Sequence, residues 1–201
     1  MMGSNGVAAA LRLAGLGHLI GHYPPNTLDR EFRFEDFAAI NQSIVEMYGP
    51  QGAKGLCLRA GRATLRNAVA EGGLMADLPD PAFKLLPAGA KVKVGLHTLA
   101  EVLSKLSDQK ARLEERDGAL FFVVETCPEC WERTSDDAIC HGTTGILLEA
   151  LHWLTDGMKY TVTETGCIAR GEPACTFEIG TRQEEAAIEE SEGTASDTVG
   201  V

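Results

Sequence analysis

Five of the six cysteines of this 201-residue chain lie in its C-terminal part, at Cys127, Cys130, Cys140, Cys167 and Cys175. Clustered thiols in a reducing compartment bind metal or carry out redox chemistry more often than they form disulfides. A single cysteine is usually a small buried hydrophobe, but that explanation fails for five together. We therefore take these five as the candidate metal ligands. Cys57 is isolated in an apolar helical segment and is expected to be structural.

The first pair forms the motif Cys127-Pro128-Glu129-Cys130. Two intervening residues let both thiolates reach one ion, a spacing found in zinc and iron-sulfur sites and also in redox dithiols. A redox dithiol of the thioredoxin type needs the second cysteine to open a helix. Here the polar segment 132–137 follows instead, which favours metal binding.

The remaining three cysteines come from other parts of the fold. Cys167 and Cys175 lie nearly symmetrically about a predicted turn at Gly171, so they are expected to face each other across a hairpin. Cys140 precedes an apolar helical segment, and the dipole at a helix N-terminus favours a thiolate. His141 is adjacent to it, but neighbouring helical residues point in different directions, so it is a weaker candidate ligand.

The elements that must position these residues follow from hydrophobic periodicity. Helices are predicted over 34–47, ending at Gly49-Pro50, and over about 56–69, where small residues indicate close packing. A buried strand is predicted over 119–124, a helix from Cys140 to about residue 156, and a final hairpin with strands over 159–169 and 175–180.

A long helix is also predicted from about Val94 to Glu115, with a leucine seam that ends at Leu113. Such a seam forms a dimer contact or packs on the protein's own sheet, and its length of barely three heptads favours the second arrangement.

Charge and hydropathy restrict the function. A formal net charge of -11 disfavours nucleic acid as a partner, because such binding relies on clustered Lys and Arg. No apolar run is long enough to span a membrane, and no signal peptide is evident, so a cytoplasmic location is the expectation. The acidic segment 181–201 is expected to be disordered.

The segment from Glu164 to Ile179, ETGCIARGEPACTFEI, resembles the C-terminal signature of the 4-vinyl reductase domain family. Cys140 and Gly145 also match that pattern, in which a Cys and then a Gly about five residues later precede the hairpin. The resemblance extends over roughly 34–180. It divides the chain into an N-terminal extension (1–33), the domain itself (34–180) and the tail.

The resemblance implies an α/β (α+β) fold, an antiparallel sheet flanked by helices, as in the ligand-binding domains of nitric-oxide signalling and vesicle-tethering proteins. Such domains are often dimeric. In sensor members a zinc ion is held by one Glu and three Cys, which correspond to Cys140, Cys167 and Cys175. The Glu would align near Glu125 or Glu129, but Cys127 and Cys130 are softer ligands. Zinc held by four of the five thiolates is the first expectation, and an iron-sulfur cluster is the second.

Two functions follow from the resemblance. The first is a binding module for a hydrophobic small molecule, such as a tetrapyrrole or an aromatic compound, with a structural metal site. The alternative is a reductase, or its accessory protein, that acts on the 4-vinyl group in (bacterio)chlorophyll biosynthesis. The chain carries no dinucleotide fingerprint, so only an iron-sulfur site would supply an electron-transfer role. The sequence leaves open whether the protein is an enzyme.

Overall fold

The computed structural model describes residues 2–25, 29, 31–71 and 81–181. Its helices are α1 (Gly3–Leu13), η1 (Gly17–Leu19), α2 (Phe34–Ala70), α3 (Pro81–Lys84), α4 (Ala88–Leu106), α5 (His141–Leu154) and η2 (Ile168–Arg170). Its strands are β1 (Ala111–Arg116), β2 (Ala119–Val124), β3 (Tyr160–Gly166) and β4 (Cys175–Thr181). The predicted acidic tail lies outside the described residues, and the division of the chain into three parts stays a prediction.

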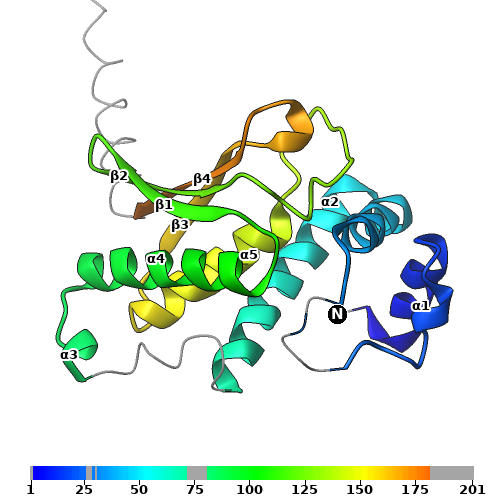
Figure 1. The fold of residues 1–201 in the computed structure, drawn as a ribbon, viewed down its shortest axis with the longest axis horizontal. Helices are drawn as coiled ribbons and strands as arrows, with labels where there is room; N and C mark the ends of the chain where they lie inside the picture. Colours follow the sequence, from blue (N-terminus) through cyan, green and yellow to red (C-terminus); the bar gives the residue numbers. More distant parts are fainter. Residues whose placement is uncertain (1, 26–28, 30, 72–80, 182–201) are drawn as a thin grey trace, which may run out of the picture.

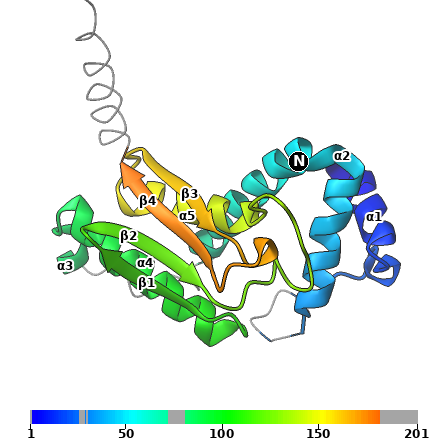
Figure 2. The same cartoon turned by 90° about the horizontal axis from the view of Figure 1, so that it is seen from above.

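The four strands form one antiparallel sheet in the order β1-β2-β4-β3, and the helices α4 and α5 lie against one of its faces (Figures 1 and 2). Strand alternation explains why that face is apolar. Phe122 of β2 is paired with Phe177 of β4 and with Leu113 of β1. Phe122 and Phe177 are both fully buried, so they form the centre of the core between the sheet and the helices.

The predicted helix break at Gly49 is present as a kink inside α2. Gly49 has φ 69° and ψ 168°, which is not helical, and Pro50 follows it. Glycine tolerates a positive φ because it has no Cβ, and proline lacks the N–H that would continue the helical hydrogen bonds. The two halves of α2 therefore run in different directions, and both are available to line one cavity.

Close approach of α2 and α5 depends on two glycines. A Cβ built on Gly61 would lie 2.0 Å from the carbonyl oxygen of Gly142, and one built on Gly145 would lie 2.3 Å from that of Leu58. Both distances are far below any van der Waals contact. The sequence prediction that this part of α2 packs through small residues is confirmed, and the contact brings the N-terminus of α5 against α2.

The predicted long helix over 94–115 is wrong in its second half. The helix α4 ends at Leu106, and residues 111–116 form β1. In β1 Leu113 faces the core while Arg112 and Arg116 lie on the opposite face, a period of two that the apparent leucine seam concealed. The link from β1 to β2 is Asp117-Gly118, both with positive φ, a sequence that favours tight hairpins.

The leucines of α4 itself pack inside the protein. Leu96 and Leu99 are fully buried and belong to the main hydrophobic core together with residues of β2 and α5. The interpretation of the seam as a helix on the protein's own sheet is thereby confirmed. In the described parts of the chain, no helix is both long and apolar enough to cross a membrane.

Candidate metal centre and apolar pocket

The five predicted cysteines come from four places in the fold and meet at one end of the sheet. Cys127 and Cys130 lie in the loop after β2, and Cys140 is the N-cap residue of α5. Cys167 follows β3, and Cys175 opens β4. All five are buried, with at most 3% of their surface exposed. The fold thus gathers segments that are distant in sequence around one group of sulfur atoms.

The sulfur atoms are in mutual contact. Cys130 lies at the centre, with its Sγ 3.1 Å from that of Cys140 and 3.5 Å from those of Cys167 and Cys175. The Sγ of Cys140 is also 3.5 Å from those of Cys127 and Cys175. Contacts of this kind are the geometry of donors that converge on a common ion.

Hydrogen bonding among these thiols separates their proton affinities. The pKa of Cys127 is lowered, because Cys130 and Cys140 donate hydrogen bonds to its sulfur. The pKa of Cys140 is raised by its hydrogen bonds with Cys127 and Cys130. In addition, the backbone N–H of Ile168 donates to the Sγ of Cys175 at 3.4 Å. Such donors stabilise sulfur in its negatively charged form, the form that binds metal.

Potential ligand atoms fall into two sets of four, each with all its atoms within 4.8 Å of one another. The first set contains Cys127, Cys130, Cys140 and Cys175, and the second contains Cys140, Glu164, Cys167 and Cys175. The structure thus adds a carboxylate, Glu164, that the sequence analysis did not select.

Glu164 points from β3 into the cluster. One oxygen, Oε2, accepts a hydrogen bond from the backbone N–H of Cys140 at 2.9 Å. The other, Oε1, is buried and has no hydrogen-bond partner among the described residues. Burial raises the pKa of this carboxyl group to about 9. A buried oxygen without a partner costs free energy, and a cation beside the sulfur atoms would remove that cost.

A sequence signal for Glu164 was present. In β3 the residues Tyr160, Val162 and Glu164 alternate onto the face that covers the core, since Val162 pairs with Ile179 and Glu164 with Phe177. A carboxylate in register with an apolar series indicates a function for that side chain.

The two glutamates that the sequence placed near the metal lie elsewhere. Glu129 is 2% exposed, and its carboxylate accepts hydrogen bonds from the backbone N–H groups of Gly142 and Thr143 at 2.8 and 2.7 Å. It therefore caps α5. Glu125 is half exposed and pairs with Arg112. Neither belongs to the two ligand sets within the described chain.

Cys57 and His141 stay outside those sets as well. Cys57 is buried in α2, where its Sγ donates to the Oδ1 of Asn41 at 3.5 Å, and burial raises its pKa to about 11. That environment fits the structural role expected for Cys57. His141 is half-buried, and its pKa is lowered, chiefly by desolvation.

The donor chemistry fits a zinc ion. Thiolates select zinc and other soft metals, and structural zinc sites take four ligands. Four sulfurs at about 2.3 Å from a central zinc lie about 3.8 Å from one another in a tetrahedron. The observed separations of 3.1 to 3.5 Å are close to that value. An iron-sulfur cluster would insert several irons and sulfides among the thiolates and hold them further apart.

An apolar pocket of about 420 Å³ lies on the other side of the Cys127–Cys130 loop. Both halves of α2 line it, together with α4, β2 and α5; the apolar side chains include Phe34, Phe37, Ile40, Ile44, Leu99, Leu103, Phe122, Ile146 and Leu147. Pro128 and Glu129 of the loop complete the wall, so the pocket and the cysteine cluster share one short segment.

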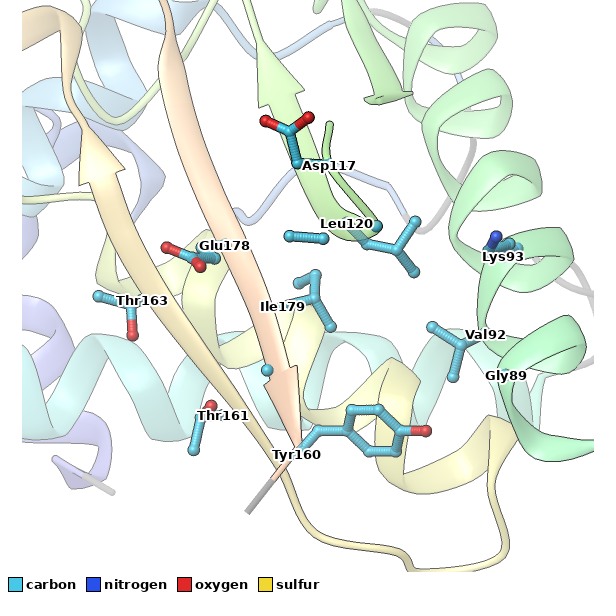
Figure 3. Close-up of a pocket in the computed structure, with 13 residues that line it drawn as sticks. Gly89, Val92, Lys93, Asp117, Leu120, Tyr160, Thr161, Thr163, Glu178 and Ile179 are labelled. Atoms are coloured by element: carbon cyan, nitrogen blue, oxygen red, sulfur yellow. The ribbon is translucent and has the colours of Figure 1, made fainter. Parts of the chain in front are cut away.

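A larger depression of about 730 Å³ lies at the far end of the sheet. Figure 3 shows Thr161, Thr163 and Glu178 on one side of β4, and Val92, Lys93 and Tyr160 on the other. Because its walls come from both faces of the sheet, it follows the sheet's rim and is no enclosed site. The smaller pocket, with its apolar walls and few polar groups, is the better candidate for a ligand.

Comparison with known proteins agrees with this arrangement. The family model of the 4-vinyl reductase domain matches residues 120–181, a range that contains β2, α5, β3, β4 and all five clustered cysteines. The resemblance to the 4-vinyl reductase domain family is therefore confirmed, and this part of the chain is a domain of that family. A search of curated proteins gave no match.

Solved structures with a similar fold include the phenol-responsive sensory domain of the transcription activator PoxR with phenol. That domain has a TM-score of 0.54 and 15% sequence identity, over 79% of this chain and 81% of that one. An H-NOX protein from S. oneidensis in the Fe(II)NO ligation state matches with a TM-score of 0.49 and 14% identity, over 88% and 96% of the two chains. The antiparallel sheet with its flanking helices, shared with the PoxR domain, confirms the predicted fold class.

Proposed function

We propose that this protein is a binding module for a hydrophobic small molecule, held together by a zinc ion on its cysteine cluster. The observation that carries the proposal is the loop Cys127–Cys130. Its two cysteines lie in the buried cluster, while Pro128 and Glu129 between them line the apolar pocket. A metal that fixes the loop would also fix one wall of the pocket.

The pocket supports a ligand of one or two rings. Its volume of about 420 Å³ is in the lower part of the range of about 300 to 1,000 Å³ found for small-molecule sites. Such a volume favours an aromatic compound over a tetrapyrrole. The related fold of a phenol-responsive sensory domain points in the same direction. A cytoplasmic location and a homodimer remain part of the proposal.

Binding can be followed through Trp131, whose ring packs edge-on against Phe34 of the pocket wall with 5.6 Å between centroids. Titration with 1-naphthol, read as binding heat and as tryptophan quenching, is expected to saturate. Replacing Ile44 in the pocket wall by Trp should weaken binding at least tenfold by filling the space, whereas the exposed Met158→Trp should bind as the unmodified protein does. Equal binding by both variants would refute this pocket.

The metal part has a separate test, in which Cys167→Ser and Cys175→Ser are compared with Cys57→Ser. All three cysteines are buried, but only the first two belong to the cluster. We expect the cluster variants to lose zinc and thermal stability together, because binding of a structural metal is linked to folding. The Cys57→Ser variant should keep its zinc. Full metal retention in both cluster variants would contradict the proposal.

The reductase alternative has no specific support in the described residues. It requires an electron donor, and the close approach of the sulfur atoms favours a zinc site over the iron-sulfur cluster that such a role would need. We therefore propose binding as the function.

A further inference from the structure

We infer that the cluster is a two-ion centre, in which Cys140 and Cys175 each bridge both metals. The inference rests on the proposed metal site and goes beyond it, since one zinc ion needs only four ligands. The cluster offers six: the five thiolates and the carboxylate of Glu164.

The count of donors matches two ions. Two four-coordinate ions have eight positions to fill, so six donors suffice when two of them are shared. The two ligand sets found in the structure have two members in common, Cys140 and Cys175. Each ion would have two donors of its own: Cys127 and Cys130 for the first, Glu164 and Cys167 for the second.

The position of the two shared sulfurs supports this assignment. The Sγ atoms of Cys140 and Cys175 are 3.5 Å apart, and each belongs to both sets. Both cysteines are fully buried. A thiolate sulfur has enough lone pairs to bind two soft cations, whereas a carboxylate oxygen or an imidazole nitrogen in this position would be a poorer bridge.

Charge gives an independent argument. The five thiolates and the carboxylate carry six negative charges in a buried site when all six bind metal. One divalent ion would leave four of these charges without compensation, and two ions would leave two. Uncompensated buried charge is costly, so the second ion stabilises the fully ionised cluster.

A single-ion arrangement is the main rival. The sulfurs of Cys130, Cys140, Cys167 and Cys175 also lie mutually within 4.8 Å, because Cys130 contacts Cys167 at 3.5 Å. That arrangement leaves two donors unused. Cys127 would be a buried thiol at its edge, and the Oε1 atom of Glu164 would stay buried without a partner among the described residues.

The test is the zinc content of the full chain, purified without an affinity tag that binds metal and measured by elemental analysis against amino-acid analysis. Two zinc ions per chain are expected. The cadmium-substituted protein should give two ¹¹³Cd resonances, one from an all-sulfur environment and one from a site with an oxygen ligand. One ion with a single resonance would overturn the two-ion centre and leave the proposed single site intact. No bound metal would overturn both.

Two variants make the assignment sharper. Glu164→Gln and Cys127→Ser each remove a ligand that belongs to one ion only, so each should lower the zinc content from two to one per chain. Glu164→Gln should abolish the oxygen-ligated ¹¹³Cd resonance, and Cys127→Ser should abolish the all-sulfur one. If the unmodified protein and both variants hold one ion, the single-ion arrangement is correct.

Discussion

At the scale of single residues, the most informative difference from the sequence analysis concerns the acids. The five cysteines were identifiable because clustered thiols are rare, and their types alone indicated metal. Glutamate is common, so its role depends on the direction of each side chain. Glu129 was considered because of its position between two cysteines, yet it points to the N-terminus of α5, while Glu164 on β3 points into the cluster.

The role of Glu129 as a cap leads to a stability prediction. Its carboxylate accepts three hydrogen bonds, from the N–H groups of Gly142 and Thr143 and from the Thr143 hydroxyl. In Glu129→Gln the amide nitrogen cannot accept any of them. We expect the free energy of unfolding to fall by about 1 to 3 kcal/mol. Urea denaturation of the zinc-loaded protein measures this change.

Glu125→Gln is the matched control, because Glu125 precedes the same loop but is half exposed. It should change stability by less than about 0.5 kcal/mol, as most surface substitutions do. If the two variants were equally stable, the interpretation of Glu129 as a buried cap would be wrong.

At the scale of elements, the prediction of strands and helices succeeded where one period dominated. The run 119–124 and the helix after Cys140 are continuous apolar patterns, and both are present. The segment 106–116 failed because Leu106 and Leu113 are seven residues apart, a spacing that suits a helical seam, while the alternation within β1 is short. The Asp117-Gly118 turn would have identified the hairpin.

The contact between α2 and α5 gives a prediction at this scale. Gly61→Ala would place a Cβ 2.0 Å from a backbone oxygen of α5, and backbone cannot move aside as a flexible side chain does. We expect a loss of at least about 1 to 3 kcal/mol, the usual cost of overpacking. Because the same contact positions Gly142 against the pocket, binding of 1-naphthol should weaken as well.

Gly55→Ala, in the same helix, is the control for helix propensity. Its added methyl group would meet the guanidinium of Arg59 at 3.6 Å, an ordinary contact. Alanine is favoured over glycine inside a helix by up to about 1 kcal/mol, so this variant should be as stable as the unmodified protein or more stable. Thermal unfolding of the two variants side by side decides the point, and a stable Gly61→Ala protein would contradict the close packing.

At the scale of the whole molecule, the metal centre and the pocket are two sides of one structural unit. Cys140 begins α5, Glu129 caps the same helix from the loop that carries Cys127 and Cys130, and α5 forms part of the pocket wall. The sequence indicated the cluster and a hydrophobic ligand separately. It could not show that they share a loop, because that depends on the long-range packing of α2 against α5.

Removal of the metal should therefore weaken ligand binding before the fold is lost. Without zinc the thiolates repel one another, the loop loses its anchor, and Pro128 and Glu129 no longer hold the pocket wall in place. We expect chelation to raise the Kd for 1-naphthol at least tenfold at low temperature, where circular dichroism still reports native helix content. Re-addition of zinc should restore the original affinity. Unchanged affinity in a folded, metal-free protein would show that the pocket is formed by the helices alone and that the cluster serves another purpose.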